Sequence, residues 1–194
     1  MITQSGRILY LEDFRTLDPM DLPLDDIQDA LERINRFSGH GISVMQHSSQ
    51  LYRIAEHLRM REAFQIACLV HDISEMAGMI DIPAPEKKMP CWAPIVEIQE
   101  AFQQRIYDHC GVKLSESEWQ TLHALDRLCA WMETYDLMSE IRMSIRNAWQ
   151  PAPVMSQVFR DAWYATYHGR NYPVQLAAIL PNWSLRSGDE EAGS

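Results

Sequence analysis

The chain has 194 residues, which suits one compact domain and argues against a solenoid or a multidomain enzyme. Hydrophobic residues make up 46% of it and charged residues 23%, as in ordinary globular proteins and unlike disordered or collagen-like chains. The 27 acidic and 17 basic side chains give a formal net charge of -10, which disfavours a nucleic acid polymer as the partner.

The sequence carries no signal for export or for a membrane. No stretch reaches about 18 consecutive apolar residues, and residues 1–7 lack the charged-then-apolar order of a secretion signal. The cysteines show no CxxC spacing, which predicts reduced thiols in a cytoplasmic protein. These cysteines are Cys68, Cys91, Cys110 and Cys129.

The first predicted elements are a short hairpin and a helix. Residues 7–18 combine one short apolar run with acidic and proline-containing sequence, which predicts at most a small strand or β-hairpin. From about Asp25 to Phe37, apolar residues recur at intervals of three and four, which predicts an amphipathic helix. The Ser-Gly-His-Gly sequence of residues 38–41 is expected to end this helix.

Two further helices and a loop are predicted next. Residues 43–60 resume the helical spacing, with Ser43 as a plausible N-cap. Residues 61–79 are apolar on nearly every side, which predicts a helix at the centre of the core that ends near Gly78. Four prolines between residues 81 and 94 then predict an irregular crossing loop.

The remaining sequence also reads as helical. Helices are expected at about 94–110 and 117–138, the latter continuing through 139–149, and another around 156–168. Residues 186–194 are polar enough to be a disordered tail. The sequence therefore predicts a single all-α domain, a helical bundle that spans residues 1–185.

Polar residues interrupt the apolar faces of three predicted helices. His47 lies on the apolar face of its helix, and Asp126 does the same on a later one. His71, Asp72 and Glu75 interrupt the most apolar segment, at spacings that place them on one side of a continuous helix. A buried polar or charged group without a partner costs several kcal/mol, so each of these residues needs a compensating interaction.

Two imidazoles and two carboxylates form a mixed nitrogen and oxygen ligand set. Such a set suits a divalent first-row metal such as Mn, Fe, Co, Ni or Zn. Any one of these side chains could instead be a hydrogen-bonded core residue. Their joint occurrence on three buried faces favours a metal site.

The order His47, then His71-Asp72, then Asp126 resembles the H...HD...D pattern of HD-domain metal-dependent phosphohydrolases. The resemblance is closer to the small 5'-deoxynucleotidase (YfbR-like) branch and extends over residues 5–145. The dATP triphosphohydrolases of phages with 2-aminoadenine DNA are similar in size and motif order. The sequence segments that carry the resemblance to the 5'-deoxynucleotidase branch are SGRILYL, INRFSGH, MQHSSQL, ACLVHDISEMAG, DIPAPEK and ALDRLCAWMETYDLM.

The resemblance implies an HD-domain bundle that holds one divalent metal ion, with Co, Mn, Zn, Fe, Ni and Mg as the candidates. The implied ligands are His47, His71, Asp72 and Asp126, and the implied catalytic residues are Glu75 and Asp72. A divalent ion lowers the pKa of bound water and offsets charge on a phosphoryl oxygen, which makes hydrolysis feasible at neutral pH. Glu75 would orient the water or carry its proton.

The resemblance also implies five substrate-binding residues. Arg36 and Phe37 match an arginine–aromatic pair in which the ring packs on the sugar and favours deoxyribose. Asp81 and Lys87 match an acidic and a basic position of a DxPxPxK loop. His40, in the turn after Phe37, is either a phosphate contact or a turn histidine without a role.

Several alternatives stay open. The substrate is a deoxynucleoside monophosphate, from which a 5'-nucleotidase removes one phosphate, or a dNTP, dATP included, from which triphosphate is released. The rival from another class is a catalytically silent regulatory module on the same scaffold. The resemblance further implies a homo-oligomer, dimer or hexamer, in the cytoplasm of a bacterial cell or a phage-infected host.

Overall fold

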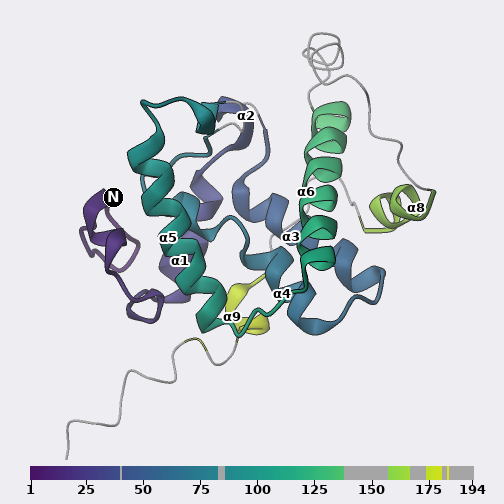
Figure 1. Cartoon of the computed structure of the whole chain (residues 1–194), viewed down its shortest axis with the longest axis horizontal. Helices are drawn as coiled ribbons and strands as arrows, with labels where there is room; N and C mark the ends of the chain where they lie inside the picture. The colour runs from purple at the N-terminus through teal and green to yellow at the C-terminus, as the bar shows by residue number, and fades with distance from the viewer. Residues whose placement is uncertain (40, 83–85, 138–156, 167–173, 181–182, 184–194) are drawn as a thin grey trace, which may run out of the picture.

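A computed structural model describes residues 1–39, 41–82, 86–137, 157–166, 174–180 and 183 (Figure 1). The described residues form α-helices and short 3-10 helices without a strand, which confirms the predicted all-α class. Their only β-structure is two isolated antiparallel bridges, Ile2–Ile8 and Asn35–Ser43. The small hairpin expected over residues 7–18 is thus reduced to one bridge before the 3-10 helices η1 (Leu11–Arg15) and η2 (Pro19–Asp21).

The first long helix, α1 (Leu24–Arg33), is shorter than predicted. Ile34 adopts an extended conformation, and the backbone N–H groups of Val44 and Arg36 donate to the carbonyls of Ile34 and Ile42. These bonds close a loop that contains only the single-turn helix α2 (Arg36–Gly39). The prediction that the helix continues to Phe37 is therefore wrong, because pairing across the loop replaces the helical hydrogen bonds.

The helix α3 (Val44–His57) begins as predicted. The Ser43 hydroxyl accepts from the Gln46 backbone, and the Gln46 side chain accepts from the Ser43 backbone, which forms a capping box. Figure 1 shows α3 near the middle of the molecule, and it packs against α1, α4, α6 and α8. Its side chains are therefore surrounded by other helices.

The next helix, α4 (Glu62–Val70), ends well before the predicted Gly78. His71 and Asp72 lie in a turn, and the 3-10 helix η3 (Ile73–Met76) follows. Gln103 satisfies the backbone on both sides of this break: its amide donates to the Val70 carbonyl and accepts from the Ser74 N–H. The predicted continuous helix is wrong because a tertiary partner takes over its hydrogen bonds.

Three later helices agree with the sequence prediction within a few residues: α5 (Ala93–His109), α6 (Glu116–Leu137) and α8 (Gln157–Thr166). The single-turn α9 (Leu176–Ile179) and the 3-10 helix η4 (Glu86–Lys88), which lies in the predicted loop before α5, were not predicted. The predicted continuation over 139–149 and the predicted tail at 186–194 lie outside the described residues.

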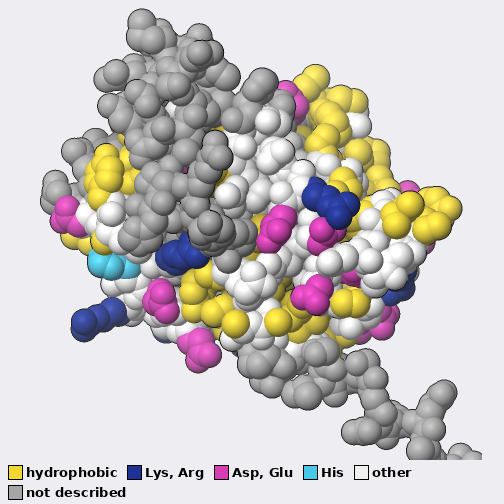
Figure 2. Space-filling view, turned by 180° about the vertical axis from the view of Figure 1, so that it is seen from behind, with side chains coloured by type: hydrophobic (Ala, Val, Ile, Leu, Met, Phe, Trp, Pro, Cys, Tyr) yellow, Lys and Arg dark blue, Asp and Glu magenta, His cyan; other side chains and the backbone are white. Residues whose placement is uncertain are grey.

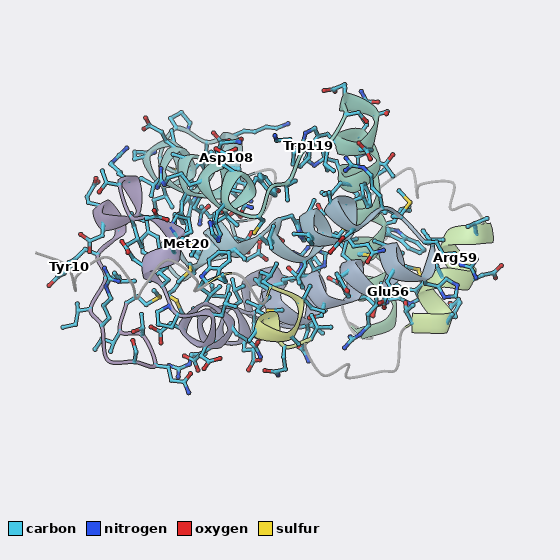
Figure 3. All side chains as sticks on the ribbon, turned by 90° about the horizontal axis from the view of Figure 1, so that it is seen from below. Tyr10, Met20, Glu56, Arg59, Asp108 and Trp119 are labelled. Atoms are coloured by element: carbon cyan, nitrogen blue, oxygen red, sulfur yellow. The ribbon has the colours of Figure 1, made fainter. Side chains whose placement is uncertain are left out.

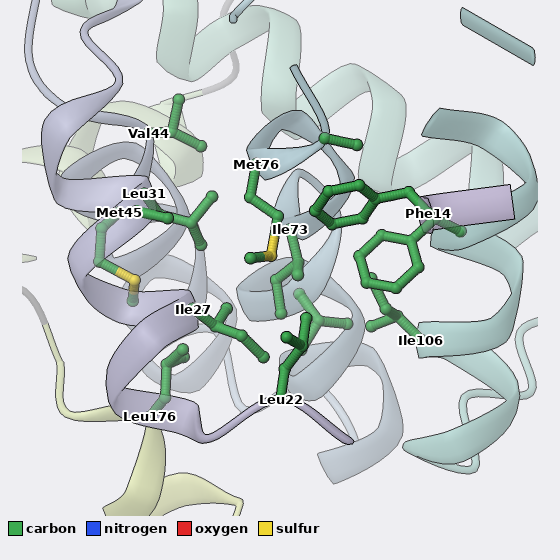
Figure 4. Packing of buried hydrophobic residues seen from close by; sticks show 14 of the residues in the cluster. Phe14, Leu22, Ile27, Leu31, Val44, Met45, Ile73, Met76, Ile106 and Leu176 are labelled. Carbon is green, nitrogen blue, oxygen red and sulfur yellow. The ribbon is translucent and has the colours of Figure 1, made fainter. Parts of the chain in front are cut away.

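Two hydrophobic clusters meet along α3. The first joins α1, η3 and α5 to the N-terminal turns; Figure 4 shows its residues Phe14, Ile27, Met45 and Ile73 among others. The second joins α3 and α4 to α6 and α8 around residues such as Trp163. His47 lies in α3 between Met45 of the first cluster and Leu51 of the second. Its imidazole is therefore enclosed by the apolar core.

The charged side chains of the described surface are mixed in sign on one face. On the face seen in Figure 2, Lys and Arg side chains lie apart from one another among acidic ones. No described helix combines the length and apolar character that crossing a membrane requires. Figure 3 shows the molecule from below, with Tyr10 and Met20 toward one end and Arg59 toward the other.

Candidate metal centre

Three of the four predicted ligands meet in one cluster. His47 comes from α3, His71 from the turn after α4, and Asp126 from α6; one ligand atom of each lies within 4.8 Å of the others. His47 Nε2 is 3.0 Å from Asp126 Oδ1, and His71 Nε2 is 3.9 Å from the same oxygen. His47 and Asp126, which are 79 positions apart in the sequence, thus lie side by side.

Asp72, the fourth predicted ligand, adjoins the same cluster. Its Oδ2 lies 3.0 Å from His71 Nε2 and 3.9 Å from His47 Nε2. The side chains of Asp72 and Asp126 are 18% and 32% exposed, so the carboxylates form the open side of the cluster, whereas the His47 side chain is fully enclosed. The expectation that all these groups point into the core is wrong for Asp126, which lies at its rim.

The hydrogen bond at the far nitrogen defines the tautomer of His71. His71 Nδ1 lies 2.9 Å from the Cys68 carbonyl oxygen, which can only accept, so Nδ1 carries a proton. The neutral ring then presents a lone pair at Nε2, which is the form that binds a metal. Cys68 therefore contributes through its backbone, while its thiol stays buried and unpaired.

The facing atoms of the cluster fit a cation. His47 Nε2 and His71 Nε2 are both buried, and a carboxylate oxygen lies 3.0 Å from each, which is the distance of an ion pair when the ring is protonated. A positive ion between imidazole nitrogens and carboxylate oxygens would satisfy all of them at once. The residues present thus fit a divalent metal with mixed nitrogen and oxygen ligands.

Electrostatics also favours a positive charge here. Burial and the Arg36 guanidinium lower the pKa of His47, but Glu133 and Asp126 outweigh both and raise it to about 10. Burial acts to raise the pKa of Asp72, yet His71 and Arg36 hold it well below its usual range. Without a metal, a proton on His47 supplies the cation, and metal binding would displace that proton.

Arg36 lies beneath the ligands. Its NH1 donates to Asp72 Oδ2 at 3.2 Å, and its NH2 is 3.9 Å from Asp126 Oδ1. The side chain is buried; burial lowers the pKa of the guanidinium, but the surrounding carboxylates raise it well above its usual value. Arg36 therefore neutralises ligand carboxylates as well as lying where the resemblance expects a substrate contact.

Phe37 is half-buried beside Arg36, whose guanidinium lies 5.6 Å from the ring centroid. Its φ is 54°, a left-handed conformation that is rare for a bulky residue and costs about 1–3 kcal/mol. It lies outside both buried clusters, so it does not continue the apolar stripe of α1. Phe37 is therefore not part of the described core.

Glu75 lies next to the cluster in η3. It is only 3% exposed, and Lys87 Nζ lies 3.6 Å from its Oε1. Burial, with the negative charges of Asp72 and Asp81, raises the pKa of Glu75 well above its usual value. Burial lowers the pKa of Lys87, but the carboxylates of Asp72, Glu75 and Asp81 raise it above its usual value. Glu75 and Lys87 thus form a contact in which burial and neighbouring carboxylates act on both groups.

A cleft of about 400 Å³ opens beside these groups. Its lining includes His71, Asp72, Glu75 and Lys87 on one side, and side chains of α5 and α6 on the other. Clefts of a few hundred Å³ commonly hold small molecules.

The predicted Asp81 acts on the pKa values of Arg36, Glu75 and Lys87. The predicted His40 lies outside the described residues.

Glu133 is a site residue that sequence reasoning missed. Its carboxylate is 1% exposed, with Oε1 at 2.5 Å from His47 Nδ1 and Oε2 at 3.3 Å from Arg36 Nε. It follows Asp126 by seven residues on α6, which is about two helical turns and hence the same face. That spacing, with Cys129 and Met132 buried between them, was the signal in the sequence.

Comparison with known proteins adds no identification. No model of a protein family matches the sequence, and no curated protein matches it.

Proposed function

We propose that the chain is a divalent-metal-dependent phosphohydrolase that acts on deoxynucleotides. The observation that carries the proposal is the pair of buried Nε2 atoms of His47 and His71, each 3.0 Å from a carboxylate oxygen. The proposed ligands are these two histidines with Asp72 and Asp126. The ordered motifs that resemble HD-domain phosphohydrolases support the choice of reaction.

The proposed chemistry depends on residues at the edge of the cluster. When bound, a divalent ion lowers the pKa of water toward neutrality and offsets negative charge on a phosphoryl oxygen. Glu75, buried and three residues after Asp72 in the chain, would orient the attacking water and carry its proton. Lys87 would hold phosphate charge at the mouth of the cleft, since its side chain is 39% exposed and its ammonium faces Glu75.

The volume and charge of the cleft support a small phosphorylated molecule as the substrate. A cationic lysine and a metal suit the phosphate end of a nucleotide, and a volume of about 400 Å³ suits a small molecule. Phe37 is not among the residues that line this cleft; the resemblance assigns its ring to the sugar, where it would disfavour an additional hydroxyl. The reaction is then either removal of phosphate from a dNMP or release of triphosphate from a dNTP, with dATP among the candidates.

One experiment tests the proposal directly. The purified chain is analysed for bound metal and then assayed with Mn²⁺, Co²⁺, Zn²⁺, Ni²⁺, Fe²⁺ or Mg²⁺ against dNMPs, NMPs, dNTPs and NTPs. Phosphate and triphosphate are detected separately, so that the two reactions are distinguished. Metal-dependent release from deoxynucleotides would support the proposal. A protein that binds no metal and releases neither product would instead support a silent regulatory module.

A further inference from the structure

We propose that Glu133 is a positioning residue that orients both the His47 imidazole and the Arg36 guanidinium for metal binding. The inference rests on the proposed metal function, because it concerns the support of the ligands. Glu133 contacts the ring nitrogen of His47 that faces away from the ligand cluster. It therefore supports a ligand and is not one itself.

The contact with His47 selects a tautomer. Glu133 Oε1 lies 2.5 Å from His47 Nδ1, and both side chains are almost fully buried. A carboxylate can only accept, so Nδ1 donates and Nε2 is left to face Asp126. Such a carboxylate–histidine contact fixes the orientation of the ring and increases its basicity as a ligand.

The contact with Arg36 gives Glu133 a second task. Glu133 Oε2 lies 3.3 Å from Arg36 Nε, while the other end of the same guanidinium donates to Asp72. A buried guanidinium needs carboxylate partners on more than one side to offset its desolvation. Glu133 thus holds one edge of the Arg36 guanidinium, and Arg36 in turn holds the carboxylate of Asp72, a proposed ligand.

The two histidine ligands are supported in different ways. The His71 ring is held by a backbone carbonyl, which no substitution of a side chain removes directly. The His47 ring depends on the side chain of Glu133, which α6 delivers two turns after Asp126. One helix therefore supplies both the ligand Asp126 and the support of the ligand His47. Unlike the support of His71, the support of His47 can be removed by substitution of a side chain.

The test compares metal binding by Glu133→Gln with that of the unaltered chain. Co²⁺ affinity is measured by titration calorimetry, and the visible spectrum of bound Co²⁺ reports the ligand geometry. We expect Glu133→Gln to weaken Co²⁺ binding about 10- to 100-fold and to alter the spectrum, as for loss of a carboxylate behind a histidine ligand. Glu133→Asp keeps the charge and should restore part of the affinity. Glu116→Gln, an exposed glutamate of the same helix, is the matched control and should change neither quantity.

A measurement on the unaltered chain covers the case in which Glu133→Gln does not fold. In the Zn²⁺-saturated protein, long-range ¹H–¹⁵N spectra should show the His47 proton on Nδ1, with assignment by difference against His47→Gln. Metal bound at Nδ1 instead would overturn the proposal. So would equal Co²⁺ affinity and spectrum in a folded Glu133→Gln. Failure of the unaltered chain to bind any metal would instead refute the proposed function.

Discussion

Lys87 Nζ lies 3.6 Å from Glu75 Oε1, so a lysine of η4 faces a carboxyl that burial has almost removed from water. The two residues are separated by the proline-containing loop, and both line the cleft. Burial raises the pKa of Glu75, whereas the ammonium of Lys87 opposes that rise. Their contact therefore lowers the pKa of the carboxyl that we propose as the proton carrier.

Replacement of Glu75 should separate binding from chemistry. Glu75→Gln keeps the size of the side chain but cannot carry the proton, so turnover should fall about 100-fold or more. Metal content and KM should stay close to those of the unaltered chain, because Glu75 is not in the ligand cluster. Glu97→Gln, an exposed position on α5, is the control. Loss of metal together with the rate would show that Glu75 is a ligand.

Replacement of Asp72 should remove the metal itself. Asp72→Ala deletes one carboxylate of the cluster and the hydrogen-bond partner of Arg36, so metal uptake and activity should both be lost. The unaltered chain should be stabilised by about 2.7 kcal/mol when free metal is 100-fold above its Kd, and this gain should vanish in the variant. Thermal unfolding with and without Mn²⁺ measures it, with Asp108→Ala on the surface of α5 as the control. Full metal occupancy in Asp72→Ala would contradict the ligand assignment.

Removal of the Phe37 ring should relax the selection of the sugar. A ring against the sugar leaves an additional hydroxyl without a partner, which costs about 1–3 kcal/mol, or roughly tenfold to a hundredfold in relative rate. Phe37→Ala should raise kcat/KM for ribonucleotides relative to deoxynucleotides by about that factor while the metal stays bound. The exposed Tyr10 provides the control, Tyr10→Ala. An unchanged preference in a folded, metal-loaded variant would leave Phe37 without a role in selection.

Gly41 offers an independent test of the proposed contact between the Phe37 ring and the sugar. A Cβ added there would lie 2.6 Å from Phe37 Cδ2 and 3.0 Å from the Arg36 carbonyl oxygen. Both distances are too short, so Gly41→Ala should displace the ring or the α2 backbone. We expect the preference for deoxynucleotides to weaken in the same direction as in Phe37→Ala, with metal content retained. A preference equal to that of the unaltered chain would show that this packing does not shape the sugar pocket.

The surface ion pair of Arg61 and Glu118 should make the free energy of unfolding depend measurably on pH. Hydrogen bonds from Arg61 and Ser115 lower the pKa of Glu118 from 4.5 to about 2. The folded-state pKa is the lower one, so the contribution of Glu118 is complete above pH 4.5 and is lost as the pH falls toward 2. The difference in free energy of unfolding between the unaltered chain and Glu118→Gln should therefore shrink from about pH 6 to about pH 3. Urea unfolding of both metal-free proteins measures it; a constant difference would exclude this linkage.

The sequence predicted the helices whose apolar periodicity is long and continuous. The helices α3, α5 and α6 lie close to their predicted positions, because an amphipathic face needs no tertiary information to be recognised. It also identified His47 and Asp126, since a polar residue on an apolar face stands out against the pattern. Local pattern was therefore sufficient for the all-α class and for most of the proposed ligand set.

Only the tertiary structure decided where helices end and which side chains share a site. The break at His71 depends on Gln103, which lies 32 residues later and binds the backbone on both sides of it. The position of Phe37 depends on hydrogen bonds across the loop between α1 and α3. Glu133 meets His47 across 86 residues of sequence. The contacts of Gln103 and Glu133 join segments distant in the chain, so they form only when the helices pack. The bonds across the loop join nearby residues, but they replace helical hydrogen bonds, and no helical periodicity encodes them.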